Sequence, residues 1–246
     1  MEIFRSKLPA SILIDHNYLF HGTSNIYESK LDTGDTKGNK EIPIELISNV
    51  LSLYKGIKWF GDHGGGYAVL STFSVADQNR KGKYLFLGET YQRSCLYATK
   101  DFAGGELNRS LYHSIRDLFT YIEDKAVREK HRKQMERDYP FTGEKYDVNL
   151  EYLNYELKKY LQIYSELSNL INSYKYGVIY CYKIEKEDYP KLIHRGQMGI
   201  MVHEPLPSKR LQAKLILNNP EEIYNENLIS NSNFKRSLIW KSRLSG

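Results

Sequence analysis

The chain has 246 residues and a formal net charge of +5, from 35 Lys and Arg against 30 Asp and Glu. This length suffices for one large domain or two small ones, and hydrophobic residues make up 41% of the chain, enough for a core and an argument against wholesale disorder. No apolar run approaches the roughly 18 residues that span a bilayer, and the first residues lack the long apolar segment of a secretory signal. We therefore expect a cytoplasmic protein with no membrane partner.

The cysteine and histidine content argues against a fold built on disulfides or metal. Cys95 and Cys181 are the only cysteines, and His113 and His131 lack the spacing of an HExxH motif. We therefore predict no metal site. The 21 tyrosines would suit a surface that stacks on rings or bases, although most are expected half-buried at the rims of sheets and helices.

The first part of the chain is predicted to hold strands and one early helix. An apolar strand ends in "HGTS", His21 to Ser24, and residues 42–54 have helical apolar spacing. Three glycines then precede an apolar, β-branched strand predicted at residues 67–75. "YLFLG" at 84–88 and "SCLYATKD" at 94–101 are each predicted as short strands.

The middle of the chain has scarcely a strand signal, and apolar residues recur there at helical spacing. We expect a helical insertion over residues 105–175, built as a hairpin of two helices that "YPFTGEK" separates at 139–145. The charged run "EDKAVREKHRKQMERD" at 123–138 is predicted to be a solvated face rather than a nucleic-acid patch, because its basic residues only modestly outnumber its acids.

Strands are predicted to return after the insertion. Residues 177–184, "GVIYCYKI", are nearly all apolar or aromatic and are typical of a central strand covered on both faces. "GIMVHEPLP" and "LQAKLIL" indicate two more strands, and residues 218–246 form a polar tail in which Ile239 and Trp240 could dock back onto the body. The fold class is therefore α+β: one domain over residues 1–246, with a strand-rich core, an early helix and the helical insertion.

Several familiar site motifs are missing. The chain has no GxxxxGK[ST] phosphate loop and no GxGxxG after a strand. "HGGG" at 63–66 is similar to an oxyanion-hole loop, but the GxSxG elbow of a hydrolase is absent. Taken alone, "HGTS" fits an ordinary turn in which Thr23 or Ser24 caps a helix. What remains is a spaced set of "HGTS", "LYATKD" with Tyr97, Tyr112 in the helical run, and "GQMGIMVHEPLP".

This ordered set resembles the ADP-ribosyltransferase superfamily, on its diphtheria-toxin-like and poly-ADP-ribose-polymerase-like side, which carries a His-Tyr-Glu triad on three strands. "FHGTS" matches the first motif and "CLYAT" the second. "VHEPLPSKRL" is similar to the segment in which many bacterial members, including the DNA-modifying DarT group, finish the third. The resemblance covers residues 15–110 and 175–217, and it implies a split β-sheet core.

The resemblance implies that NAD⁺ is the substrate and that the chemistry uses no metal. His21 would hydrogen-bond ribose hydroxyls of the adenosine half, while Gly22 would let the backbone approach the carboxamide. Tyr97 and Tyr112 would stack on or enclose the nicotinamide ring and exclude water from it. The predicted NAD⁺-binding residues are His21, Gly22, Thr23, Ser24, Tyr97 and Tyr112.

The third catalytic position departs from the family pattern. Cleavage of NAD⁺ creates an oxocarbenium-like ribose, which a carboxylate at the 2′-hydroxyl would stabilise. Counted back from "PLP", that glutamate falls at Gly199 or Ile200. Three interpretations stay open: Gln197 fills the position, Glu204 does, or the position is apolar, as in members that transfer a single ADP-ribose. Against the first two, Gln197 could cap a turn and Glu204 could be a solvated residue before a proline.

These implications predict a mono-ADP-ribosyltransferase with His21, Tyr97 and either Glu204 or Gln197 as catalytic residues. Its acceptor would be a macromolecule, with DNA or RNA slightly favoured over protein. A small freestanding enzyme of this kind would be a bacterial or phage toxin or effector, and an inhibitory antitoxin protein would be a partner. Two alternatives remain: an RNA 2′-phosphotransferase related to the superfamily, and a non-catalytic binding module on a degenerate fold.

Overall fold

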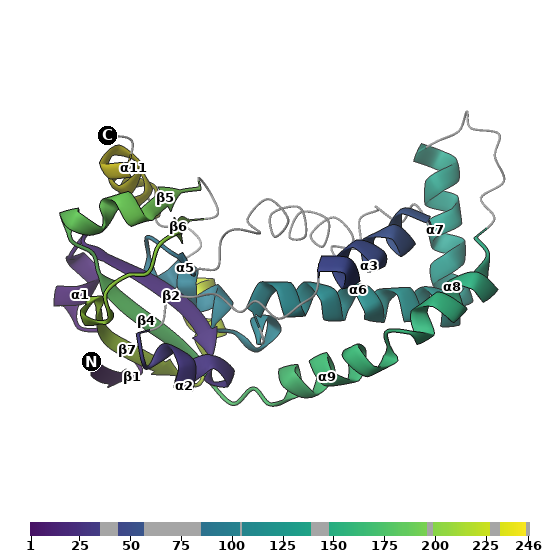
Figure 1. The fold of residues 1–246 in the computed structure, drawn as a ribbon, viewed down its shortest axis with the longest axis horizontal. Helices are drawn as coiled ribbons and strands as arrows, with labels where there is room; N and C mark the ends of the chain where they lie inside the picture. The colour runs from purple at the N-terminus through teal and green to yellow at the C-terminus, as the bar shows by residue number, and fades with distance from the viewer. Residues whose placement is uncertain are drawn as a thin grey trace. The chain divides into compact units, whose positions relative to one another are not determined.

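A computed structural model describes residues 1–34, 44–56, 85–103, 105–138, 148–195, 199–226 and 232–244. The chain is α+β and divides into two compact units (Figure 1). The sheet unit comprises Met1–Lys40, Asn79–Glu106 and Leu170–Gly246, and the helical unit comprises Glu41–Gln78 and Leu107–Asn169. The strand predicted at 67–75 and the "HGGG" motif lie outside the described residues.

The sheet unit contains two sheets. The four-stranded sheet has the order β1-β7-β4-β2, with β1 parallel to β7 and the other neighbours antiparallel. The antiparallel three-stranded sheet has the order β3-β6-β5. An isolated bridge between Phe20 and Gly88 joins the edge of β2 to the end of β3. The strands are β1 (Glu2–Arg5), β2 (Tyr18–Ser24), β3 (Phe86–Leu87), β4 (Gly177–Lys183), β5 (Leu192–His194), β6 (Ile200–Val202) and β7 (Leu211–Leu217).

Strand β4 forms the centre of the larger sheet, and it is buried on both faces. Tyr180 and Tyr182 point into one core cluster, whereas Ile179 and Cys181 point into another. Because successive side chains of a strand face opposite ways, an unbroken apolar run requires cover on both sides. The prediction of a covered central strand at 177–184 is therefore confirmed.

Helices of the sheet unit cover these faces. They are α1 (Ala10–Ile14), α2 (Glu28–Leu31), α5 (Tyr91–Tyr97), α10 (Pro220–Glu226) and α11 (Ser232–Leu244), with 3-10 turns η1 (Asn25–Tyr27), η2 (Lys100–Phe102), η3 (Lys186–Lys191) and η5 (Ser208–Arg210). The segment expected to be a polar tail thus forms two helices. Trp240 of α11 is fully buried, as the prediction of docking required.

The prediction of a strand at 94–101 is wrong, because helix α5 occupies the first half of this segment and the 3-10 turn η2 begins at its end. Thr90 precedes the helix, and its hydroxyl accepts a hydrogen bond from the Arg93 amide. Such a cap favours a helix, and a short apolar run alone cannot distinguish a helix from a strand. Tyr97 consequently lies on the last turn of a helix.

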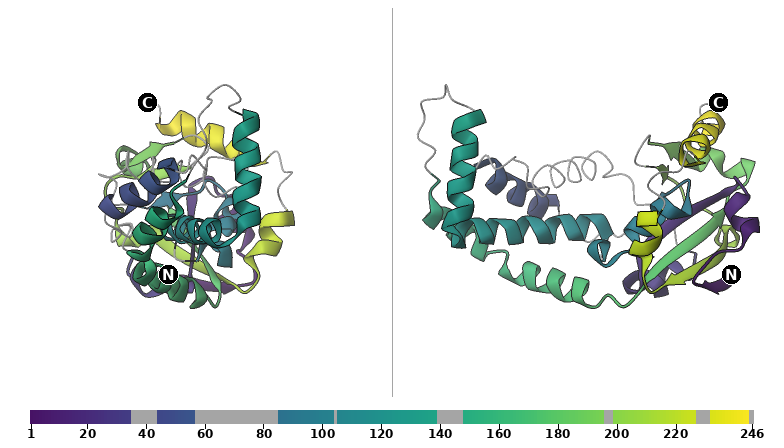
Figure 2. Two further views of the ribbon diagram at one scale, coloured as in Figure 1. Left: turned by 90° about the vertical axis from the view of Figure 1, so that its right-hand side faces the viewer. Right: turned by 180° about the vertical axis from the view of Figure 1, so that it is seen from behind.

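The helical unit is built around an apolar core. Leu111, Ile115 and Leu118 follow one face of α6, and they pack with Leu153 and Leu157 of α8. Helix α9 runs beside α6, as the views in Figure 2 show. The helices are α3 (Ile44–Gly56), α6 (Gly105–Glu123), α7 (Lys125–Asp138), α8 (Leu150–Lys158) and α9 (Leu161–Asn172).

The helix predicted at 42–54 is confirmed from Ile44 onward, and helices are confirmed across the middle, but each of the two long helices expected there is divided. Asp124 interrupts the first, since its carboxylate accepts hydrogen bonds from the amides of Ala126 and Val127 and so caps α7. A tight turn interrupts the second, where the amides of Lys159 and Tyr160 bond to carbonyls three residues earlier. None of the described helices is long and apolar enough to cross a membrane.

Candidate functional site

The "HGTS" segment lies within strand β2, beside the point where the two sheets meet. His21 pairs with Tyr180 of β4, and its Nδ1 lies 2.9 Å from the carbonyl oxygen of Phe86 at the start of β3. Burial lowers the pKa of His21 from its ordinary value, although the bond to Phe86 acts in the opposite direction. Because a carbonyl only accepts, the neutral ring donates through Nδ1, and its Nε2 carries the lone pair.

Helix α5 packs directly on β2 and β4 because glycines face it. A Cβ atom at Gly22 would lie 1.7 Å from the carbonyl oxygen of Ser94, and one at Gly177 would lie 2.4 Å from that of Ala98. Gly22 therefore has a structural reason to be glycine besides the approach of a cofactor. The same contacts bring "CLYAT", which is distant in sequence, against "HGTS".

Thr23 and Ser24 do not form the turn that "HGTS" alone could have made. Both belong to β2 and are buried, and Ser24 makes no side-chain capping bond to the 3-10 turn that follows it. The Ser24 hydroxyl has no hydrogen-bond partner among the described residues. It is therefore a buried polar group on the face of β2 that α5 covers.

The two predicted tyrosines lie in different units. Tyr97 is half-buried at the end of α5, where its ring meets Phe102 edge-on at a centroid distance of 5.1 Å. Tyr112 belongs to α6 in the helical unit, and its ring stacks on Tyr164 at 5.1 Å, with the ring planes 2° apart. Burial and a hydrogen bond with Tyr112 raise the pKa of Tyr164 to about 12. One face of the Tyr112 ring is thus occupied within the helical unit.

The residues around the third motif are mostly apolar and buried. Gly199 has a φ of +95°, and a Cβ atom there would lie 2.6 Å from the carbonyl oxygen of Leu87. Ile200 is fully buried in the core. Glu204 follows β6 with an exposed side chain, and Gln197 lies outside the described residues. The two positions indicated by counting from "PLP" are thus filled by tightly packed backbone and an apolar side chain.

Sequence reasoning did not single out Glu89, a buried carboxylate at the same sheet junction. Its side chain is only 3% exposed, with Oε1 3.4 Å from His194 Nε2 and Oε2 3.5 Å from Arg93 Nη1. Its backbone carbonyl accepts a hydrogen bond from Arg236 of α11. The sequence signal that could have identified Glu89 is its position directly after Gly88, between a strand and Thr90, which caps the next helix.

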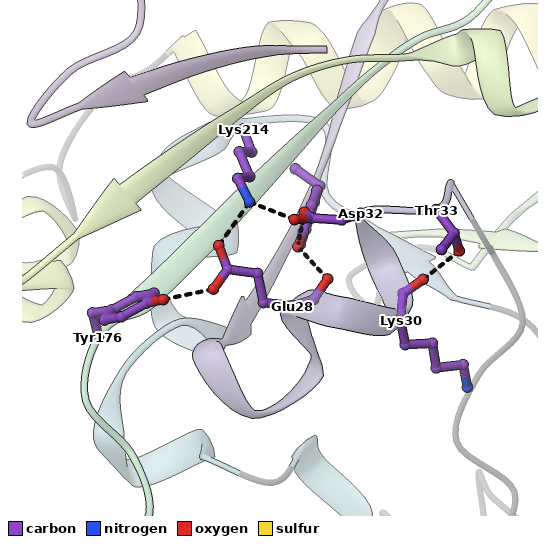
Figure 3. Close-up of polar contacts among 7 residues, drawn as sticks. Glu28, Lys30, Asp32, Thr33, Tyr176 and Lys214 are labelled. Carbon is purple, nitrogen blue, oxygen red and sulfur yellow. Dashed lines mark hydrogen bonds and ion pairs between the residues drawn. The ribbon is translucent and has the colours of Figure 1, made fainter.

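A second polar cluster fixes the chain where it leaves "HGTS" (Figure 3). Lys214 of β7 donates to Glu28 at 2.7 Å and to Asp32 at 2.6 Å, and the hydroxyls of Tyr176 and Tyr180 donate to the same two carboxylates. Burial would lower the pKa of Lys214, but the bonds to Asp32 and Glu28 raise it overall. The cluster ties α2 to the sheet.

Among the described residues, no group of three or more His, Cys, Asp or Glu side chains is arranged to hold a metal ion. No protein-family model matches the chain, and neither a curated protein nor a solved structure matches it.

Proposed function

We propose that the chain is an NAD⁺-dependent mono-ADP-ribosyltransferase, with the site in the sheet unit around β2 and the end of α5. The observation that carries the proposal is the contact between two motifs far apart in sequence. Gly22 lies against the carbonyl of Ser94, three residues before Tyr97. The adjacent His21 is held in one tautomer by Phe86 at the sheet junction.

The residues at this junction suit the first step of the reaction. His21 Nε2 accepts a hydrogen bond from a ribose hydroxyl, Thr23 on the same face of β2 adds a donor, and Tyr97 covers the nicotinamide ring. The bond between ribose C1′ and the nicotinamide nitrogen breaks, and nicotinamide leaves with the electron pair. The acceptor then donates an electron pair to C1′ and loses its proton to solvent.

The group that stabilises the ribose cation is Glu204 or Gln197. Transfer of a single unit follows from the apolar side chain and packed backbone at Gly199 and Ile200, since no carboxylate is available there. The acceptor is a macromolecule, and nucleic acid is favoured over protein. We further propose that the enzyme is a cytoplasmic toxin or effector of a bacterium or phage, held in check by an antitoxin protein.

The test incubates the purified protein with NAD⁺ and separate pools of DNA, RNA and cell protein. Nicotinamide release and a mass gain of one ADP-ribosyl unit on one pool would support the proposal and identify the acceptor class. No release with any pool would favour a non-catalytic binding module, an alternative that the apolar third position supports. NAD⁺ consumption only with 2′-phosphorylated RNA would favour a phosphotransferase.

Variants test the site assignment. His21→Ala and Tyr97→Ala should each lower the transfer rate by about 100-fold or more, because they misplace the reacting bond. Tyr155→Ala, at an exposed tyrosine of α8, is the matched control and should leave transfer unchanged. Circular dichroism would verify folding of each variant. Unchanged transfer in both site variants would overturn the assignment.

A further inference from the structure

Helix α7 carries a concentration of positive charge that its neighbours lack. Its 14 residues include six Lys or Arg and three Asp or Glu. Each of the other described helices of the helical unit has at least as many acidic as basic residues. The basic character of this unit's described helices therefore comes from α7 alone.

The charges of α7 are sorted onto one face. Val127 packs against the apolar core, and His131 is buried with its Nδ1 3.5 Å from the Tyr121 hydroxyl. Helical periodicity places the opposite side in solvent. An open hollow on that side is lined by Lys125, Ala126, Glu129, Lys130 and Lys133.

Ion pairing leaves the three lysines of this face available. Arg132 forms ion pairs with Glu129 at 2.9 Å and with Glu136 at 2.7 Å. Both acidic residues of this face are therefore paired with a single arginine. The hydrogen bond and charge of Arg132 lower the pKa of Glu129. Within the described ranges, Lys125, Lys130 and Lys133 form no ion pair. A count of charges along the sequence could not separate these lysines from the paired residues.

We propose that this lysine face of α7, Lys125, Lys130 and Lys133, binds the phosphate backbone of a nucleic acid. The lysines extend along about 12 Å of helix at 1.5 Å per residue, and duplex DNA carries one phosphate charge per about 1.7 Å of its axis. Among the described residues that line the hollow, Ala126 alone is apolar, whereas membrane-surface helices and protein hot spots need large apolar or aromatic side chains. Binding through lysine ammonium groups is independent of base sequence.

The inference does not rest on the proposed transferase activity, and its test omits NAD⁺. Fluorescence anisotropy would measure binding of a labelled RNA duplex and a DNA duplex of the same sequence over a range of salt concentrations. The triple variant Lys125→Ala, Lys130→Ala, Lys133→Ala should weaken binding by about 10-fold or more and lower the slope of log affinity against log salt by about 3.

A matched control removes the same charge elsewhere. The triple variant Lys158→Ala, Lys186→Ala, Lys209→Ala changes three exposed lysines on other elements and should leave affinity unchanged. Equal weakening by both triple variants would overturn the proposal, as would a wild type that binds neither duplex or that binds only anionic lipid vesicles. Preference for RNA or for DNA would identify the source of the phosphates.

Discussion

Each unit has a cationic side chain that pairs with two carboxylates. The two cations differ in how deeply they are buried and in how far away in the sequence their partners lie. Lys214 in the sheet unit has a side chain 6% exposed, and its partners Glu28 and Asp32 are 186 and 182 residues away in sequence. Arg132 in the helical unit is 50% exposed, and its partners lie three and four residues away on the same helix. The buried Lys214 joins segments that are distant in sequence, whereas the exposed Arg132 pairs with residues of its own helix, which the apolar core already holds.

Other charged residues extend this contrast. Arg210 is buried in the sheet unit, with Asp188 2.6 Å and Glu185 2.5 Å away across a 3-10 turn. Arg236 of α11 donates to the backbone carbonyls of Leu13 and Asp15 near the other end of the chain. The helical unit, by comparison, buries a cluster of leucines, an isoleucine, a valine and tyrosines. The sheet unit should therefore be far more sensitive to the loss of one charge.

The largest expected effect is that of Lys214→Ala. Removing the ammonium leaves Glu28 and Asp32 together without their cation. Because these carboxylates are 19% and 35% exposed and keep hydrogen bonds to Tyr176 and Tyr180, we expect the free energy of unfolding to fall by about 2–3 kcal/mol, less than for a fully buried pair. The measurement is denaturant unfolding followed by Trp240 fluorescence, in a Trp59→Phe background that leaves this single tryptophan.

Two controls accompany the Lys214 prediction. Lys209→Ala removes an exposed lysine next to β7 and should leave the unfolding midpoint unchanged. The combination Lys214→Met, Glu28→Gln, Asp32→Asn removes the uncompensated charge and should recover most of the lost stability. Equal stability of Lys214→Ala and the wild type would show that the cluster does not hold α2 to the sheet.

The next effect is that of Gly22→Ala. The new methyl group would lie 1.7 Å from the Ser94 carbonyl, so α5 must move off β2, which we expect to lower the free energy of unfolding by about 1–3 kcal/mol. Hydrogen exchange should show faster exchange of α5 amides, with α6 to α9 unchanged. Gly105→Ala is the control for adding a methyl group at a glycine, since nothing lies within 4 Å of its Cβ position, although its positive φ adds some strain. Unaltered exchange in α5 of Gly22→Ala would contradict the packing.

These differences explain what the sequence could predict. Helices of the middle region follow from the spacing of Leu111, Ile115 and Leu118, because periodicity reports a local apolar face. Helix α5 could not be predicted from such spacing, because its position depends on Gly22 and Gly177, which allow its backbone to approach closely. The burial of Glu89 likewise depends on His194 and Arg236, which are more than 100 residues away. Local patterns predict the helical unit well, while the site lies where distant segments meet.

A smaller effect is expected at alkaline pH, and it should occur in both units. Burial raises the pKa of Tyr174 in the sheet unit and of Tyr164 in the helical unit to about 12 each, from an ordinary 10.0. The folded state favours the neutral phenols, so their contribution is complete below pH 10 and is lost as pH rises from 10 to 12. Unfolding at a series of pH values measures this loss. Tyr174→Phe and Tyr164→Phe should each reduce this loss of stability. If both variants lost as much stability between pH 10 and pH 12 as the wild type does, the assignment would be contradicted.

The smallest effect on stability is expected for Arg132→Ala, although it removes two ion pairs. Arg132 and its partners are exposed, so water and salt solvate the charges that remain, and the denaturant midpoint should stay within error of the wild type. Nucleic-acid binding should nevertheless weaken, because Glu129 and Glu136 are then unpaired beside Lys125 and Lys133. The double variant Glu129→Gln, Glu136→Gln should bind more tightly for the same reason. A midpoint shift for Arg132→Ala as large as that for Lys214→Ala would show that ion pairs contribute equally to the stability of the two units.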